Sequence, residues 1–190
     1  MHHLLLGLTE GWRRRRQLRA LLRLTPSSRT VLDLTPEQVR AEGVVALAVD
    51  FDGVLAPHGG EAPLPEAVVW LRSMASALGE DKLVILSNRP KGPRLDWFRQ
   101  EMPGVRVLAG VRKKPYPDGL IQAGEQMSAP LSMILMVDDR LLTGCLAALV
   151  AGCRPWYVRR PFVDWRGEAC HELFFMLLRR GERLLVRLFP

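Results

Sequence analysis

Short, nearly continuous apolar runs alternate with helix-length segments along the chain from residue 44 onward. Such runs are typical of strands that are covered on both faces, as in a parallel sheet between two layers of helices. We therefore predict an α/β fold in which a Rossmann-like parallel sheet of about five strands is flanked by helices. The predicted strands are residues 44–49, 83–86, 105–109, 133–137 and 156–158.

The other segments carry the start and stop signals of helices. Three of them open on proline, which is well accommodated in a first helical turn, and two are followed by glycine, which often ends a helix. Upstream, Thr35 and Gln38 on either side of Pro36 predict a short helix with a capping box, ended by Gly43. The remaining predicted helices are residues 65–78, 93–102, 117–127, 142–151 and 166–180.

The net charge of +7 is concentrated at the two ends of the chain. Residues 1–43 and 153–190 each hold eight arginines against four acidic residues, whereas the middle holds eleven basic against twelve acidic residues. Basic ends indicate an anionic partner, and the alternative is that these arginines lie on solvated helix faces. We predict a basic N-terminal helical extension (1–43), a core (44–160) and a basic C-terminal helical segment (161–190).

Leucines lie beside arginines in residues 4–24, with Leu18, Leu21 and Leu22 at helical spacing. A helix on a membrane surface and a helix docked on the protein's own core both have this pattern. Apolar runs fall short of the roughly 18 residues of a membrane span, and the order of the first residues is not that of a secretory signal. We expect a cytoplasmic protein with peripheral contact to an anionic membrane. The arginines for this contact are Arg13 to Arg16, Arg19, Arg23, Arg179, Arg180, Arg183 and Arg187.

Four polar clusters follow the first four predicted strands. Each alone fits an ordinary turn, helix cap or loop. Together they fall at the carboxyl edge of the sheet, where α/β proteins bind ligands. We therefore predict one site at this edge. The clusters are Asp50 and Asp52, Ser87 and Asn88, Lys113 and Lys114, and Asp138 and Asp139.

The ordered set DFDGV, SN, KKP and VDD resembles the four motifs of the haloacid dehalogenase superfamily, most of whose members are magnesium-dependent phosphohydrolases. The resemblance covers about residues 44–160. It implies a Rossmann-like core, bound Mg²⁺ and an aspartyl-phosphate intermediate. The implied roles are nucleophile for Asp50, general acid and base for Asp52, phosphate binding for Ser87, Asn88 and Lys114, and metal binding for Asp50, Asp52, Asp138 and Asp139.

The chemistry of these residues is consistent with such a reaction. A phosphomonoester and two carboxylates repel one another unless a divalent cation and a lysine offset the charge, and Mg²⁺ prefers oxygen ligands. Asp50 would attack phosphorus, while Asp52 would protonate the leaving oxygen and then activate water. Gly53 would let the backbone come close to the phosphate.

A closer resemblance covers residues 22–160, through LTPSSRTVLDLTPEQVRAEGV, DFDGVL, SNR, KKP and TGCLAALVAG. These segments resemble the YqeG-type branch of subfamily IIIA, which includes mitochondrial phosphatidylglycerophosphate phosphatases. The chain departs from that pattern at three places. Gly53-Val54 replace Asn-Thr, Arg89 replaces an asparagine, and Gly144 stands where an acid is usual. Asp139 would supply the missing carboxylate.

Neither short connection after the first two strands has room for a cap domain. Nine residues separate Leu55 from Pro65, and one helix and one strand fill the chain from Arg89 to Lys113. In the superfamily that the chain resembles, cap domains close over small substrates, so the resemblance implies that a member without a cap suits a large substrate or one presented at a surface. His58, in the first connection, would either contact the substrate or be solvated.

These observations favour a Mg²⁺-dependent phosphatase of an anionic lipid phosphate such as phosphatidylglycerophosphate. One alternative is a phosphatase of a soluble or nucleic-acid phosphate, for which the basic ends would bind a polyanion. A nucleic-acid partner is the less favoured of these. The other alternative is a non-catalytic binding module on the same fold, against which the retention of both Asp50 and Asp52 argues.

Overall fold

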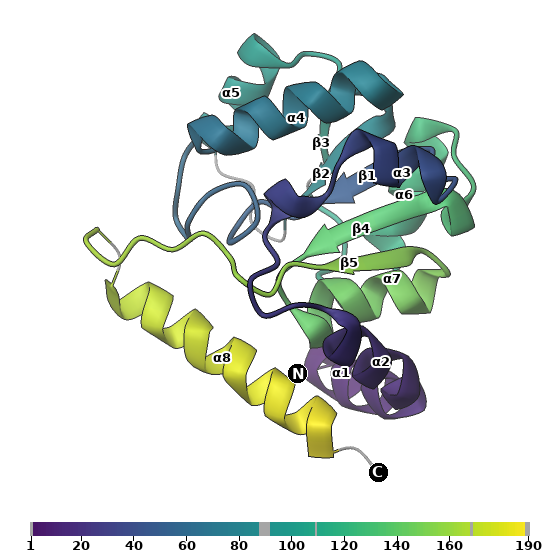
Figure 1. Ribbon diagram of the computed structural model, residues 1–190, viewed down its shortest axis with the longest axis vertical. Helices are drawn as coiled ribbons and strands as arrows, with labels where there is room; N and C mark the ends of the chain where they lie inside the picture. Colours follow the sequence, from purple (N-terminus) through teal and green to yellow (C-terminus); the bar gives the residue numbers. More distant parts are fainter. Residues whose placement is uncertain (1, 88–91, 109, 168, 189–190) are drawn as a thin grey trace.

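The computed structural model describes residues 2–87, 92–108, 110–167 and 169–188, and its centre is one five-stranded sheet (Figure 1). The strand order is β3-β2-β1-β4-β5, and every neighbouring pair is parallel. The predicted α/β fold is therefore confirmed. The strands are β1 (Ala46–Val49), β2 (Leu83–Leu86), β3 (Arg106–Leu108), β4 (Ile134–Asp138) and β5 (Arg154–Tyr157).

Helices cover both faces of the sheet (Figure 1). Side chains alternate along β1, so that Leu47 and Val49 pack with α3, α4 and α5, whereas Ala46 and Ala48 pack with α6 and α7. The helices are α1 (His2–Arg13), α2 (Arg15–Leu24), α3 (Pro36–Ala41), α4 (Pro65–Leu78), α5 (Gly92–Glu101), α6 (Asp118–Met127), α7 (Leu146–Ala151) and α8 (Ala169–Leu188), with shorter helical turns at η1 (Val31–Asp33), η2 (Glu80–Lys82), η3 (Leu131–Met133) and η4 (Leu141–Cys145).

Local signals explain several element boundaries. α4 has the predicted bounds, and the capping box that opens α3 is present: Thr35 Oγ1 accepts from the Gln38 N–H at 3.3 Å, and Gln38 Oε1 accepts from the Thr35 N–H at 3.0 Å. In the described residues, only a loop follows β1, and only α5 and β3 lie between residue 92 and Lys113. Neither connection therefore holds a cap domain in the part that the structure describes.

The terminal helices pack on the protein itself. Leu18 and Leu22 of α2 are buried in an apolar cluster with Leu141, Tyr157 and Val186, the last of which comes from α8. The leucine stripe therefore faces the protein's own core, which decides between the two alternatives for that pattern. We call this group, completed by Cys145 and Leu146, the terminal-helix cluster. None of the described helices has the length and apolar character needed to cross a membrane.

The end of the C-terminal helix differs from the prediction. Gly181 was expected to end a helix at residue 180, but α8 continues through it to Leu188. A glycine inside a helix costs only about 1 kcal/mol relative to alanine. The buried residues Arg179, Glu182 and Val186 anchor α8 on both sides of Gly181, and their contacts outweigh that cost.

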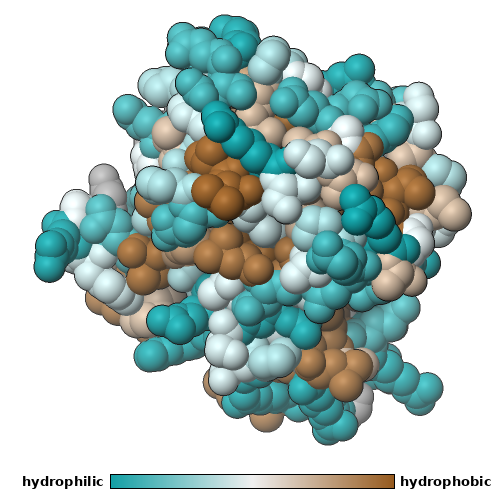
Figure 2. Space-filling model, turned by 45° about the horizontal axis from the view of Figure 1, so that its top comes forward, coloured by the Kyte–Doolittle hydropathy of each residue, from teal (hydrophilic) through white to brown (hydrophobic). Residues whose placement is uncertain are grey.

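The surface is mixed in character. Figure 2 shows one face, on which separate apolar patches alternate with hydrophilic residues. Large exposed apolar side chains occur on both terminal helices; they include Leu5, Leu8 and Trp12 of α1 and Leu173, Phe174, Leu177, Leu184 and Leu188 of α8.

Candidate active site

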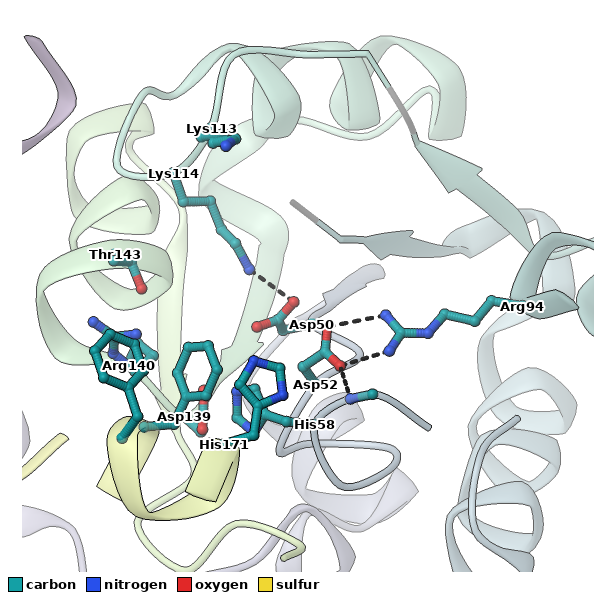
Figure 3. Close-up of a pocket in the computed structure, with 13 residues that line it drawn as sticks. Asp50, Asp52, His58, Arg94, Lys113, Lys114, Asp139, Arg140, Thr143 and His171 are labelled. Atoms are coloured by element: carbon teal, nitrogen blue, oxygen red, sulfur yellow. Dashed lines mark hydrogen bonds and ion pairs between the residues drawn. The ribbon is translucent and has the colours of Figure 1, made fainter. Parts of the chain in front are cut away.

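The site lies where the strand order reverses, at the carboxyl edge between β1 and β4 (Figure 3). Val49 pairs with Val137, so Asp50 and Asp138 emerge side by side from neighbouring strands. A cavity of about 430 Å³ opens there. Four of the predicted site residues line it, namely Asp50, Asp52, Lys114 and Asp139, together with Lys113.

Lys114 joins the first and fourth motifs. Its Nζ lies 2.9 Å from Asp50 Oδ1 and donates a hydrogen bond to Asp138 Oδ2 at 2.6 Å. Burial alone would lower the pKa of Lys114, but the two carboxylates outweigh it, and the pKa is raised above its usual value. Lys114 is thus a buried, permanent cation directed at the nucleophile candidate.

Asp50, Asp138 and Asp139 form a group that could hold a metal ion. One carboxylate oxygen from each lies within 4.8 Å of the others. Burial raises the pKa of Asp50 to about 8, Lys114 opposes this rise, and the charges of Asp138 and Asp139 add to it. Three crowded carboxylates, of which Asp138 and Asp139 are buried and Asp50 is partly buried, fit a hard divalent cation, because its charge would relieve their repulsion. Asp52 stands outside this group.

Arg179 of α8 reaches into the site and pairs with Asp139. Its Nε donates to Asp139 Oδ2 at 2.5 Å, and both side chains are buried. Burial raises the pKa of Asp139 to about 6, although Arg179 acts in the opposite direction. Arg179 was expected on the membrane-facing basic surface. That expectation is wrong, because only 3% of the residue is exposed.

Gly53 and Gly144 leave room for these carboxylates because they carry no side chain. A Cβ on Gly53 would lie 2.4 Å from Asp139 Oδ2 and 2.8 Å from Arg179 Nη2. A Cβ on Gly144 would lie 1.7 Å from Asp138 Oδ2. A side chain at either position would collide with the acidic group. The present arrangement of Asp138, Asp139 and Arg179 therefore requires glycine at both positions.

Asp52 is held by Arg94, a residue that the sequence analysis did not single out. The guanidinium donates to both carboxylate oxygens, at 2.9 and 2.6 Å (Figure 3). Its Nε donates to the Gly60 carbonyl at 2.7 Å. It also lies 4.0 Å from the centroid of the Phe51 ring. This bidentate pair fixes the orientation of Asp52 at the cavity wall.

His58 joins the loop after β1 to α8 and is buried. Its ring stacks on Phe175 with centroids 3.7 Å apart, and its backbone N–H donates to Glu172 Oε1 at 2.9 Å. Burial, with a further contribution from the charge of Arg179, lowers the pKa of His58 to about 3. His58 is therefore neutral. Its Nδ1, 3.3 Å from Arg179 Nη2, acts as an acceptor, and the 3.5 Å approach of Glu172 is no ion pair.

α8 also forms one wall of the cavity. His171, Phe174 and Phe175 line it, and Phe174 is 55% exposed. The sequence analysis assigned this helix to the periphery, and only its three-dimensional packing shows the contribution. The cavity therefore has a charged floor from the sheet edge and a largely aromatic wall from the C-terminal helix.

The second motif is less closely connected to the cavity. Ser87 is buried at the end of β2 and is not among the described residues that line the cavity. Asn88 and Arg89 lie outside the described residues. The phosphate-binding roles of Ser87 and Asn88 stay predictions.

Comparisons with known proteins give one structural likeness. No protein-family model matches the sequence, and no curated protein does. An uncharacterized protein from Corynebacterium glutamicum ATCC 13032 Kitasato, known from a crystal structure, is 23% identical. The match covers 73% of this chain and 96% of that chain, with a TM-score of 0.48.

Proposed function

We propose that this chain is a metal-dependent phosphomonoester hydrolase of the haloacid dehalogenase type that works through an aspartyl-phosphate. The observation that carries this proposal is that Asp50, Lys114 and Asp139 line one cavity at the carboxyl edge of the sheet, while the buried Asp138 contacts Lys114 and belongs to the same acidic group. A carboxylate beside a buried lysine and further acids is a nucleophile suited to a phosphate, once cations offset the charge.

The reaction uses Asp50 and Asp52 in turn. Asp50 attacks phosphorus, the bond from phosphorus to the leaving oxygen breaks, and Asp52, which has to enter this step in its protonated form, gives that oxygen its proton. Asp52 then takes a proton from water, and the resulting hydroxide attacks phosphorus, which releases phosphate and restores Asp50. Arg94 keeps the Asp52 carboxylate directed at the cavity, and Lys114 offsets negative charge beside Asp50.

Asp50, Asp138 and Asp139 would hold a divalent cation, for which we propose Mg²⁺. Such an ion supplies charge neutralisation between the carboxylates and the phosphate. Asp52 was also predicted as a metal ligand; its carboxylate pairs with Arg94 and lies outside this group, and its role toward the metal stays a prediction.

The decisive experiment is a phosphate-release screen with Mg²⁺ across lipid, sugar and nucleotide phosphates, using wild type and Asp50→Asn. We expect Asp50→Asn to fold and lose essentially all activity, whereas Asp96→Asn, a change at an exposed acid of α5, keeps it. Turnover by Asp50→Asn that is free of wild-type contamination would remove the nucleophile assignment. If EDTA leaves the activity of the wild type unchanged, the proposed metal requirement is wrong.

Within this function, a lipid phosphate such as phosphatidylglycerophosphate is the proposed substrate. Phe174, which lines the cavity, continues into exposed Leu173 and Leu177 on the outer face of α8, so the cavity wall adjoins apolar surface that a bilayer would cover. We expect faster phosphate release from the lipid in vesicles than from small soluble esters. If soluble or nucleic-acid phosphates are hydrolysed faster than the lipid, the proposed lipid substrate is wrong and the faster class of phosphate takes its place. If none of these phosphates is hydrolysed, the chain is a binding module.

A further inference from the structure

A second basic pocket lies away from the candidate active site. It has a volume of about 310 Å³ and is lined by four arginines around Leu22. They come from three segments that are distant in sequence: Arg19 and Arg23 from α2, Arg159 from the chain after β5, and Arg187 from α8. The fold thus brings both basic ends of the chain together. None of the four residues lines the candidate active site.

Among the described residues that line the pocket, four are basic and none is acidic. α2 contains no acid, and neither do residues 154–163 or residues 183–188. The two described acids of α8 are buried on its inner side, where Glu172 accepts from the His58 backbone and Glu182 pairs with Arg140. Four arginines that line one pocket give it a positive potential, which favours the binding of an anion.

Backbone contacts hold the pocket in shape. Arg159 Nη1 donates to the Thr25 carbonyl at 2.8 Å and to the Leu22 carbonyl at 3.5 Å. The backbone N–H of Arg159 donates to the Arg29 carbonyl at 3.0 Å. Leu22 packs in the terminal-helix cluster, to which α8 contributes Val186. The arginines are therefore carried by elements that are fixed relative to one another.

We propose that this pocket binds a phosphate-type oxyanion, in the form of a phosphoester headgroup or a pyrophosphate. Guanidinium groups match such anions because they donate two parallel hydrogen bonds to paired oxygens. Two exposed leucines adjoin the pocket residues in sequence: Leu24, 78% exposed, follows Arg23, and Leu188, 68% exposed, follows Arg187. Both kinds of ligand would be recognised through their phosphate group. That group belongs either to a soluble molecule or to the headgroups of an anionic lipid surface.

The position of the pocket also links it to the cavity. Arg187 lies eight residues after Arg179 on α8, which at the rise of a helix is roughly 12 Å along its axis. An anion held at Arg187 would thus lie at the other end of the helix whose first half forms the cavity wall. This binding site does not depend on the proposed hydrolysis.

The test compares Arg19→Gln/Arg23→Gln/Arg187→Gln with Arg72→Gln/Arg99→Gln/Arg106→Gln. Both triple variants remove three exposed or partly exposed arginines and keep Arg159, but only the first set lies in the pocket. Calorimetric titration with pyrophosphate, without Mg²⁺ and at constant ionic strength, is expected to show binding that weakens by about tenfold or more in the first variant only. Equal weakening in both variants, or no wild-type binding beyond that of chloride, would overturn the proposal.

Vesicles distinguish the two sources. Wild type and both variants are sedimented with phosphatidylcholine vesicles that do or do not contain about one third phosphatidylglycerol. If the source is lipid, wild type and the control sediment with the anionic vesicles, and the pocket variant does not. If it is soluble, pyrophosphate binding is lost in the pocket variant while none of the three sediments. Because the readout is binding, an inactive protein would disprove the phosphatase and leave this site standing.

Discussion

Gly144 is the residue on which the shape of the acidic group depends most directly, because a Cβ there would overlap the Asp138 carboxylate. We predict that Gly144→Ala displaces Asp138 from Lys114, destabilises the fold by about 1–3 kcal/mol and reduces the rise in melting temperature that we expect Mg²⁺ to produce in wild type. The measurement is thermal unfolding with Mg²⁺ and with EDTA.

Gly181→Ala is the matched control, since nothing lies within 4 Å of the added Cβ and α8 is helical there. It should stabilise the protein by about 0.5–1 kcal/mol and leave the response to Mg²⁺ unchanged. A normal Mg²⁺ response in Gly144→Ala would show that Asp138 is not needed for the metal.

Arg179 and a divalent cation would compete for Asp139. Arg179→Gln leaves a buried carboxylate without its partner, so we predict a loss of about 3–5 kcal/mol in the absence of metal. The same change should enlarge the Mg²⁺-induced rise in melting temperature, because no guanidinium has to be displaced. The exposed neighbour provides the control, Arg180→Gln, which should behave as wild type. A smaller Mg²⁺ response in Arg179→Gln would mean that Arg179 supports the metal site.

His58 gives the stability a defined pH dependence. Its pKa falls from 6.5 to about 3 on folding, mainly through burial. Between those values the unfolded chain binds a proton that the native protein does not, so this residue destabilises the fold as the pH drops below 6.5, by up to about 1.4 kcal/mol per pH unit. The difference in unfolding free energy between wild type and His58→Gln should be flat above pH 7.5 and fall below pH 6.5. If the difference in unfolding free energy between the two proteins does not change with pH, the lowered pKa of His58 is refuted.

At the scale of elements, the bounds of a helix or strand were predictable where the segment has both an apolar pattern and local signals, such as proline or glycine, at its ends. β2 and α4 have the predicted bounds, and the alternation of strands and helices gave the correct sheet class. β3 and β5 are shifted by one or two residues, because their ends depend on pairing with neighbouring strands. Ala109, the predicted last residue of β3, lies outside the described residues. The extent of α8 was missed because tertiary contacts override a single exposed glycine.

The same distinction explains the candidate site. Asp138 ends β4, and Asp50, Lys114 and Asp139 come after strands, so the topology of a parallel sheet predicts that the four residues meet. Arg94 and Arg179 lie inside helices, where an arginine looks like any solvated charge until the helix is packed. The sequence carries only a weak signal for them: an acid-rich sheet edge needs more cations than Lys114 alone. The arginines that supply these cations are fixed by long-range contacts. Arg94 is 42 residues from Asp52 in the sequence, and Arg179 is 40 residues from Asp139.

For the whole molecule, α8 is an integral part of the fold. It contributes Val186 to the terminal-helix cluster, Arg179 to Asp139 and Glu182 to Arg140. A chain that ends at residue 167 would expose the apolar surface around Tyr157 and leave the buried Asp139 without its cation. Each unpaired buried charge costs several kcal/mol, which is a large part of the stability of a typical domain.

We therefore predict that a chain shortened to residue 167 lacks cooperative thermal unfolding, as followed by circular dichroism. The control is a chain that lacks residues 1–13, because no described residue of α1 belongs to the terminal-helix cluster. It should unfold cooperatively and lose fewer degrees of melting temperature. If the chain shortened to residue 167 melts cooperatively within a few degrees of wild type, α8 is a peripheral addition. Its ion pairs with Asp139 and Arg140 then contribute little to stability, and the site would form from residues 44–160 alone.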